Sequence, residues 1–261
     1  MSDPVMGRWR SASWEILPEE HQPPVMHVAL DEALLTTVAR GERRPTLRFW
    51  AWSAPAVILG RFQSFRNEID ATGAAELGLT VVRRISGGGA MLVQPDMTIT
   101  YSLYMPTMML EGMTIRDSYQ FCDHWVVDAL RSLGADVAYV PLNDIASPVG
   151  KVGGAAQARR PGVVLHHTTI AYQMNSGDLV RALRIGREKI SDKGIPSANK
   201  RVHPLGEQVV MARDSIVAYL ISAFRERFGG EPSRITAAER AHAAELVEKR
   251  YATQEWTLEL P

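Results

Sequence analysis

The segment that most constrains the fold of this chain is Arg83-Arg84-Ile85-Ser86-Gly87-Gly88-Gly89-Ala90, which places three consecutive glycines between two apolar runs. Residues 79–82 before it and 90–93 after it have compositions typical of β-strands. Three glycines cost conformational entropy and provide no side chain for packing. Such a turn is favourable where the backbone approaches a ligand closely, and neighbouring arginines suit an anion. Successive strand residues alternate in direction, so at most one arginine faces the turn and the other is expected to be a solvated charge.

A second glycine-rich segment, Gly150-Lys151-Val152-Gly153-Gly154-Ala155-Ala156-Gln157, carries one lysine among small residues. The glycines let a ligand lie against the backbone, where an ammonium group can contact a carbonyl oxygen and a phosphate together. Neither segment has the GxxxxGK[ST] spacing of a Walker-type loop. From the residues alone, a catalytic lysine and a surface lysine in a glycine-rich hairpin have about equal weight. Together the two segments predict a site for a molecule with a negatively charged group.

Three other positions offer polar side chains to a ligand. Asn143-Asp144 precedes the lysine segment and can orient a nucleotide or hold Mg²⁺, although a turn is the favoured interpretation of these residue types. His166 and His167 alternate on one strand, and no HxxxH or HxH spacing provides a further metal ligand. One of the two is expected to be structural or to line an entry. Arg61 follows a strand, where a phosphate contact and a surface role are equally supported.

Composition limits the class of protein. The 261 residues contain 29 Lys+Arg and 29 Asp+Glu, and this balance argues against a nucleic-acid partner. Cys122 is the sole cysteine, which excludes an intramolecular disulfide and predicts a buried, inert thiol in a helix. Residues 1–10 lack the apolar core of a signal peptide, and the longest apolar stretch, 55–59, is too short to span a membrane. We therefore expect no membrane association and a cytoplasmic location.

The pattern of elements favours an α+β fold. Helical spacing predicts helices over 25–40, 68–77, 115–133, 177–183, 208–228 and 236–251. Strand patterns cover 13–17, 47–50, 56–59, 98–104, 136–140, 151–157 and 163–173, with 47–50 and 56–59 as a hairpin and 191–203 as an irregular mobile loop. Strands often follow one another without an intervening helix, which predicts a mixed, mostly antiparallel sheet flanked by helices. Residues 1–261 show no linker and are expected to form a single domain.

Taken in order, these segments resemble the lipoate–protein ligase A family, part of the biotin/lipoate ligase catalytic-domain superfamily. The similarity runs from about residue 25 to residue 256, and the linked RRxSGGGA and GKxxGxAQ segments carry most of its specificity. The matching pieces are Ala29-Leu30-Asp31-Glu32-Ala33-Leu34, Leu47-Arg48-Phe49-Trp50, the run 55–63, the two glycine segments, Asn143-Asp144 and Leu165-His166-His167-Thr168-Thr169-Ile170.

This resemblance implies a reaction in which ATP and lipoate give lipoyl-adenylate, which a target lysine then attacks. Lys151 matches the family's active-site lysine, which bridges the acyl carbonyl and the phosphate. The segment that covers the acyl chain and the adenylate matches Arg84, Ser86, Gly87, Gly88, Gly89 and Ala90. Asn143 and Asp144 match the nucleotide side, with Asp144 as the expected Mg²⁺ ligand. The other positions expected to bind substrate or nucleotide are Arg61, Gly153, Ala155 and His167.

The implied partner is a lipoyl domain or lipoyl-carrier protein, either a dehydrogenase E2 component or a GcvH-like carrier. The resemblance also implies a short form, because the chain ends at Pro261 without the small carboxy-terminal accessory domain of the longer ligases. Short relatives can use that domain as a separate accessory subunit for adenylate formation. This chain is accordingly expected to be one catalytic domain over residues 1–261, acting independently or as half of a two-component ligase.

The stretch after the triple glycine departs from the family pattern. Family members usually carry a His-Asp pair shortly after the triple glycine, whereas Met91-Leu92-Val93-Gln94-Pro95 has neither residue. An octanoyl or lipoyl transferase of the same fold is the main alternative, but it uses a cysteine thioester, and no cysteine lies near the lysine segment. A biotin ligase has a different glycine-arginine loop. The intact lysine and arginine-glycine segments argue against a non-catalytic acyl- or nucleotide-binding module.

Overall fold

The computed structural model describes residues 4–184 and 202–260, and nine strands of that part of the chain form one sheet. The strands of this main sheet are β1 Glu15–Leu17, β2 His21–Gln22, β3 Thr46–Trp52, β7 Thr98–Pro106, β8 Ala138–Val140, β9 Asp144–Ala146, β10 Lys151–Arg160, β11 Val163–Ala171 and β12 Glu231–Pro232. Their order is β12-β1-β3-β7-β11-β10-β9-β8, with β2 paired to β3. The contacts of β1 with β12 and β3, and of β2 with β3, are parallel, and the other pairs are antiparallel. The predicted mixed, mostly antiparallel sheet is confirmed.

A separate three-stranded sheet carries the glycine turn. It consists of β4 Ala56–Leu59, β5 Thr80–Arg83 and β6 Met91–Val93, in the order β5-β4-β6. The triple glycine connects β5 to β6, as the sequence predicts. The predicted hairpin of 47–50 with 56–59 is wrong, because β3 belongs to the main sheet and β4 to this small one. Every residue of both strands is buried, so neither strand has a polar face that would reveal its neighbour.

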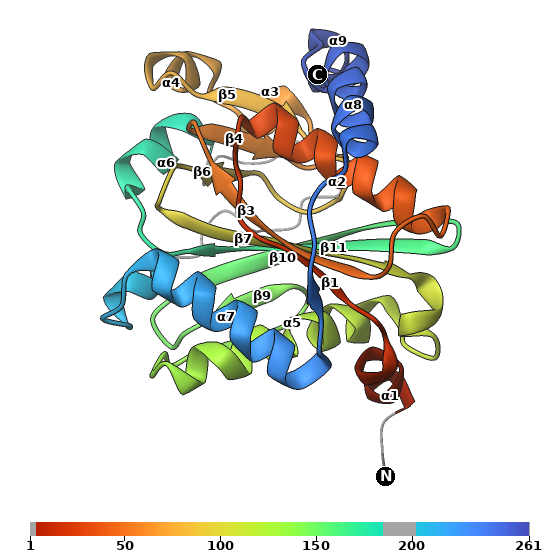
Figure 1. The fold of residues 1–261 in the computed structure, drawn as a ribbon. Coiled ribbons are helices and arrows are strands. Elements are labelled where there is room, and N and C mark those ends of the chain that lie inside the picture. The colour runs from red at the N-terminus through yellow and green to blue at the C-terminus, as the bar shows by residue number, and fades with distance from the viewer. Residues whose placement is uncertain (1–3, 185–201, 261) are drawn as a thin grey trace.

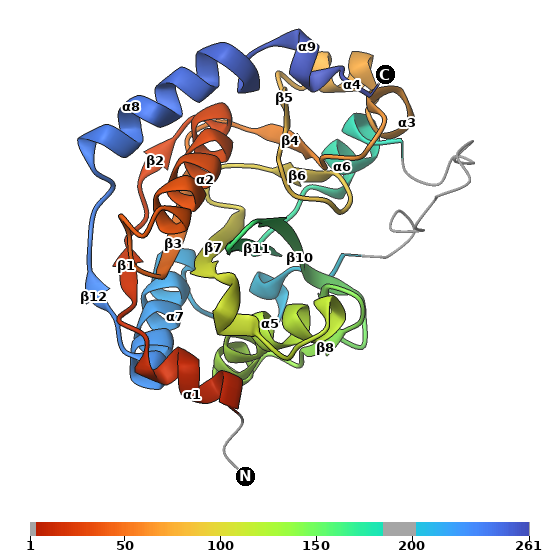
Figure 2. The same ribbon diagram turned by 90° about the vertical axis from the view of Figure 1, so that its right-hand side faces the viewer.

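Helices cover both faces of the main sheet (Figures 1 and 2). The α-helices are α1 Pro4–Ser11, α2 Pro24–Ala39, α3 Phe65–Glu68, α4 Ala71–Glu76, α5 Ile115–Ser132, α6 Ser176–Ala182, α7 Arg213–Phe228, α8 Ala237–Leu246 and α9 Gln254–Thr257. Short 3₁₀ turns occupy η1 Thr107–Leu110 and η2 Leu205–Glu207, and η3 Val247–Tyr251 is π-helical. α2 contacts β7 and β11 on one face, whereas α5 contacts β10 and β11 on the other and packs on α7.

The two faces hold two separate apolar cores. Phe49 and Trp125 belong to the core on the α5 and α7 side, whereas Trp50 and Trp52 belong to the core on the α2 side. Adjacent strand residues point to opposite faces, so β3 supplies aromatic rings to both. Cys122 of α5 is fully buried, as predicted.

Several predicted helix boundaries differ from the structure for local reasons. The expected helix 68–77 is divided, because Ile69 is extended and the Asp70 carboxylate caps α4 by accepting from the Gly73 N–H. The helix expected from 208 begins at Arg213, after the 3₁₀ turn η2. The helix 236–251 changes to a π-helical turn at Val247. The loop expected over 191–203 lies, except for its last two residues, outside the described residues.

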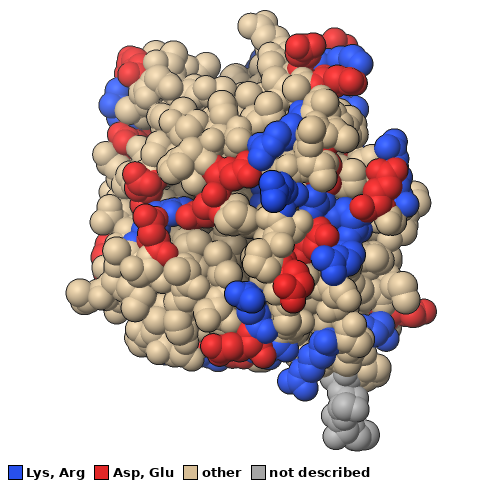
Figure 3. Space-filling view, in the orientation of Figure 1, with Lys and Arg blue, Asp and Glu red and all other residues tan. Residues whose placement is uncertain are grey.

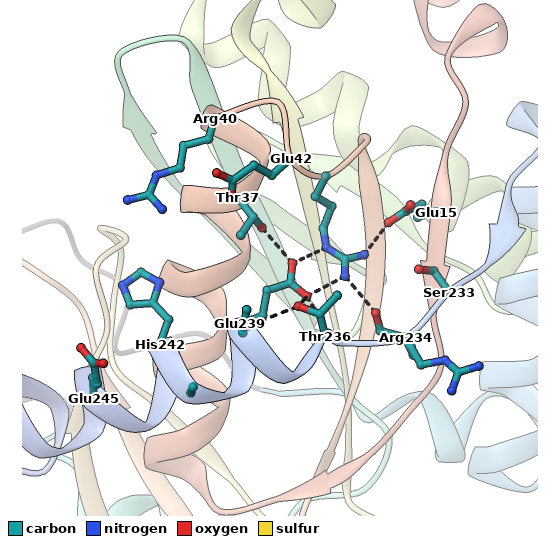
Figure 4. A pocket seen from close by; sticks show the side chains of 13 residues that line it. Glu15, Thr37, Arg40, Glu42, Ser233, Arg234, Thr236, Glu239, His242 and Glu245 are labelled. Atoms are coloured by element: carbon teal, nitrogen blue, oxygen red, sulfur yellow. Dashed lines mark hydrogen bonds and ion pairs between the residues drawn. The ribbon is translucent and has the colours of Figure 1, made fainter.

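A groove of about 670 Å³, lined mainly by polar and charged residues, lies along the end of α2 and the start of α8 (Figure 4). Glu239 forms a capping box with Thr236 and accepts two hydrogen bonds from the buried Arg43 guanidinium. Arg43 also pairs with Glu15 on β1. Acidic and basic side chains are likewise interspersed on the face drawn in Figure 3. Arg43 thus links Glu239 at the start of α8 to Glu15 on β1, and this ion-pair network fastens α8 to the sheet.

We expect this attachment to weaken in acid. Burial alone would raise the pKa of Glu239, but hydrogen bonds from Arg43 and from the Thr236 N–H lower it to about 2. A carboxylate with a lowered pKa stabilises the fold above its ordinary value near 4.5, and this contribution disappears as the pH falls toward 2. The stability difference between wild type and Glu239→Gln should therefore be roughly 2–3 kcal/mol at pH 7 and should shrink between pH 5 and pH 2. Urea unfolding at several pH values measures it, and a constant difference would contradict the assignment.

Candidate active site

The triple glycine is held in place by Arg84, whose guanidinium is buried inside the turn. Its Nη2 donates to the carbonyl oxygens of Gly87 at 2.5 Å and Gly89 at 2.9 Å. Its Nη1 donates to Ile58 O on β4, and its Nε donates to Ser86 Oγ. Burial lowers the pKa of Arg84 to about 10, so the group stays charged at pH 7. Arg84 therefore supports the loop from within, and its predicted contact with the adenylate stays a prediction.

Gly88 explains why the turn requires glycine. Its φ of +82° is a conformation that side chains disfavour. A Cβ built on Gly88 would lie 3.1 Å from Arg84 Nη2 and 3.6 Å from the Ala156 Cβ. The turn thus lies directly against β10 and the second glycine segment, as expected for two walls of one site.

Arg83 points the other way, as predicted for alternating strand residues, but it is not a solvated charge. Its side chain is fully buried and donates to the carbonyl oxygens of Gly60 and Gln63, and to that of Thr257, the last residue of α9. The prediction of a solvated arginine is therefore wrong. The carboxy-terminal segment supplies acceptors that no local sequence pattern indicates, and Arg83 fastens this segment to β5.

Lys151 lies at the first position of β10, where the pairing with β9 is irregular. The register of β10 against β9 shifts between Lys151 and Gly153. Its Nζ lies 2.8 Å from Asp144 Oδ1, and its side chain is 30% exposed, so the ammonium is paired but reachable from solvent. A Cβ on Gly154 would approach this Nζ to 2.7 Å, so glycine at 154 allows the lysine side chain to lie along its own strand. Asp144 is a strand residue, and the turn favoured for Asn143-Asp144 is wrong for it.

The strand β10 brings most of the predicted residues into one line. Asn143 donates through Nδ2 to Ala155 O at 2.6 Å, and the Ala155 N–H donates to Asn143 O. Gly153 pairs with Ile170 of β11, where a Cβ would approach Thr169 O to 2.9 Å. Lys151 begins β10, Asp144 of the neighbouring strand β9 pairs with it, and the glycine turn lies against the middle of β10. Their binding roles stay predictions.

Arg61 lies beside this line but is engaged elsewhere. Its backbone N–H donates to Ser86 O at 2.8 Å, and its guanidinium pairs with Glu259 at 2.7 Å. The same guanidinium stacks on Trp256, 4.5 Å from the ring centre. The phosphate contact expected of Arg61 stays a prediction.

The two adjacent histidines face opposite sides of the sheet, as predicted, and each meets a buried carboxylate. His167 Nδ1 lies 2.9 Å from Asp31 Oδ2 on α2, and its Nε2 lies 2.6 Å from Ser86 Oγ. His166 Nε2 lies 2.8 Å from Asp123 Oδ1 on α5. Both rings are buried, so the substrate contact expected of His167 stays a prediction.

Four further residues at or behind the site are absent from the sequence predictions of site residues. Tyr119 on α5 accepts through its hydroxyl from the Gln157 N–H, and Asp31 holds His167. The His203 N–H donates to Lys151 O at 2.8 Å. Asp31 and Gln157 lie within the segments that match the family, so the resemblance could have indicated them as site residues. Tyr119 and His203 reach the site only through tertiary contacts.

Metal and membrane features are limited to what the described residues show. Within residues 4–184 and 202–260, no group of three or more His, Cys, Asp or Glu side chains is arranged around a possible metal ion. No helix in the same part of the chain is long and apolar enough to cross a membrane. One carboxylate with water and substrate phosphates is an ordinary way to bind Mg²⁺, so Asp144 fits the predicted role through its donor type alone.

Relatives of known sequence and solved structures resemble this chain over nearly its full length. The octanoyltransferase LipM of Moorella thermoacetica is 31% identical over 270 residues, which cover 94% of this chain and 97% of the relative. The lipoate-protein ligase A subunit 1 of Thermoplasma acidophilum is 31% identical over 248 residues, with coverages of 90% and 92%.

Two solved structures share the fold. The bi-partite lipoate protein ligase of Thermoplasma acidophilum, described together with its E2 lipoyl domain, has a TM-score of 0.82 at 30% identity and covers 95% of this chain and 98% of its own. A lipoate-protein ligase A bound with ATP has a TM-score of 0.81 at 27% identity, with coverages of 95% and 100%. Residues 23–225 match the family described as the lipoyl protein ligase A/B catalytic domain, and this chain belongs to that family.

Proposed function

We propose that this protein is a lipoate–protein ligase, which activates lipoate with ATP to lipoyl-AMP and transfers the lipoyl group to a lysine of a lipoyl domain. The observation that carries the proposal is the position of Lys151. Its ammonium lies over Gly154, beside Asp144, on the strand whose middle packs against the triple-glycine turn. A cation at that point can bridge the acyl carbonyl and the α-phosphate, where negative charge develops during both half-reactions.

The cysteine of this chain argues against the transferase alternative. Family relatives include octanoyltransferases. A transferase that works through a cysteine thioester needs a reactive thiolate. Cys122, the sole cysteine of the sequence, is fully buried in α5. Burial, and next the charge of Asp123, raise the pKa of its thiol well above the ordinary value. The thiol is therefore protonated and inaccessible, which favours the ATP-dependent reaction.

Replacing Cys122 by alanine should leave lipoylation within about twofold of wild type. Alanine removes the sulfur and creates only a small cavity, at a cost of roughly 1–2 kcal/mol in stability. Transfer of a lipoyl or octanoyl group to a lipoyl domain, followed by the mass of the acceptor, measures this outcome. A loss of transfer with retained folding would instead support a Cys122 thioester and the transferase function.

ATP, lipoate and Mg²⁺ are the proposed small molecules. A related ligase structure contains ATP, and the matching fold of this chain supports the same nucleotide here. Lys151, Asn143 and Asp144 would face the phosphates, and Mg²⁺ held by Asp144 would neutralise part of their charge. The proposed protein partner is a lipoyl domain, by analogy with the E2 lipoyl domain studied with the bi-partite ligase.

Lipoate-dependent ATP–pyrophosphate exchange tests the first half-reaction. We expect exchange from the purified chain, either alone or with an accessory subunit of the bi-partite type. Supplied lipoyl-adenylate with a lipoyl domain tests the second half-reaction separately. If the chain gave neither exchange under both conditions nor transfer from the adenylate, the ligase proposal would be wrong. Transfer without exchange under both conditions would assign the chain to the transfer half alone.

A further inference from the structure

A continuous series of buried hydrogen bonds connects α2 to the triple-glycine turn. Asp31 accepts from His167 Nδ1 at 2.9 Å, His167 Nε2 meets Ser86 Oγ at 2.6 Å, and Arg84 Nε donates to Ser86 Oγ at 2.9 Å. Arg84 in turn donates to the carbonyl oxygens of the glycine turn. The series joins a rigid helix to a segment that has no side chains of its own to hold it.

The direction of each bond follows from the donors available. The Asp31 carboxylate only accepts, so His167 carries its proton on Nδ1 and presents Nε2 as an acceptor. The Ser86 hydroxyl then donates to Nε2 while it accepts from Arg84, which uses its proton and one lone pair. Burial lowers the pKa of His167, so the ring is neutral near pH 7 and this arrangement is complete.

The order Asp–His–Ser has the bond pattern of a nucleophilic triad, but its burial excludes that role in this conformation. Ser86 is fully buried and its hydroxyl already accepts from a cation, which reduces its nucleophilicity. Asp31 is the common anchor, because its Oδ1 also accepts from Ser102 at 3.0 Å and from Tyr104 at 2.5 Å. The series is built to hold a group still.

We propose that His167 is a positioning residue, which orients Ser86 and through it Arg84, and so sets the position of the triple-glycine turn against β10 for the acyl substrate. That the turn is positioned for an acyl substrate rests on the proposed ligase function. The consequence is that the two ends of the ring have different tasks: Nδ1 anchors the ring to α2, and Nε2 controls the turn.

Two amide substitutions separate these tasks. In His167→Asn the amide nitrogen lies near the Nδ1 position and keeps the bond to Asp31, but the acceptor for Ser86 is lost. In His167→Gln the longer side chain brings an amide oxygen near the Nε2 position, which keeps the acceptor for Ser86 and gives up the bond to Asp31. His167→Ala removes both. If His167 only stabilised the fold through its bond to Asp31, the His167→Asn protein would perform at least as well as the His167→Gln protein in every assay.

Amide hydrogen exchange of peptides covering residues 84–93 reads the turn without any substrate. We expect amide hydrogen exchange at residues 84–93 to be about tenfold faster in His167→Asn and His167→Ala. In His167→Gln it should proceed at the wild-type rate. In the lipoate-dependent exchange assay, the KM for lipoate should rise about tenfold in His167→Asn and stay within about threefold in His167→Gln. Tyr104→Phe is the matched control, because it removes a buried bond to the same carboxylate and should lower Tm without changing exchange at 84–93.

The positioning role would be overturned if amide hydrogen exchange at 84–93 were equal in His167→Asn and His167→Gln, or faster in His167→Gln. If the wild-type protein gave no lipoate-dependent reaction, the ligase proposal would fail. The amide hydrogen exchange measurement would still decide the role of His167. A change at 84–93 in Tyr104→Phe equal to that in His167→Asn would also overturn it, since any loss at Asp31 would then suffice.

Discussion

Lys151→Ala is expected to lose at least about a thousandfold of lipoate-dependent ATP–pyrophosphate exchange. The Lys151 ammonium lies 2.8 Å from the carboxylate of Asp144 and over Gly154, where a substrate can approach the backbone. Removing one group that stabilises developing negative charge typically costs a factor of about 10²–10³, and here the same group serves both the carbonyl and the phosphate. Exchange with saturating ATP and lipoate measures adenylation, and lipoyl transfer from supplied adenylate measures the second step.

The fold should tolerate this change. The Lys151–Asp144 pair is partly exposed, and such pairs contribute roughly 1 kcal/mol or less to stability. Lys249→Ala is the matched control, because Lys249 is an exposed lysine of η3 that pairs with Glu245 of α8. It should retain wild-type exchange. A Lys151→Ala protein that is folded and keeps more than a tenth of the wild-type rate would remove Lys151 from the chemistry.

Arg84→Met is expected to destabilise the protein by roughly 3–5 kcal/mol, which corresponds to about 10 °C in Tm, and to abolish lipoate-dependent exchange. Methionine fills much of the same volume but leaves the carbonyl oxygens of Ile58, Gly87 and Gly89 without their donor. Buried acceptors without partners each cost about 1–3 kcal/mol. Urea unfolding measures the loss of stability. Lipoate-dependent ATP–pyrophosphate exchange, assayed below the Tm of the variant, measures the effect on activity.

Arg83→Met is the matched control for Arg84→Met. Arg83 is equally buried and also donates to backbone oxygens, but those oxygens belong to residues 60–63 and to α9. Both variants should lose stability, whereas faster amide exchange at 84–93 should be confined to Arg84→Met. If Arg83→Met loosened the glycine turn to the same degree, the turn would be held by general packing and not by the Arg84 guanidinium.

The family, the fold class and the strand–glycine–strand arrangement could be predicted because each depends on local residue patterns. The helix at 115–133 has apolar spacing and ends before Gly134, and the structure places α5 there with that glycine at a φ of +93°. The hairpin of 47–50 with 56–59 failed for a different reason. Fully buried strands carry no alternation, so their partners are chosen by packing between distant segments.

The site itself shows the same division. The opposite directions of Arg83 and Arg84, and of His166 and His167, follow from the two-residue period of a strand and are confirmed. What each side chain meets did not follow. Arg83 finds one of its acceptors, Thr257 O, more than 170 residues away, and His167 finds Asp31 on a helix 136 residues earlier.

By itself the sequence determined that this chain has a triple-glycine turn between strands, a lysine among glycines, one cysteine, and the spacing of a lipoyl ligase family member. Those properties reside in residue types and short separations along the chain. The tertiary structure decided that Arg84 supports the turn from within, that Arg83 fastens the carboxy-terminal segment, and that Asp31 reaches the turn through His167 and Ser86. Buried donors and acceptors must find partners wherever the folded chain places them, and for these residues most of the partners lie far away in sequence.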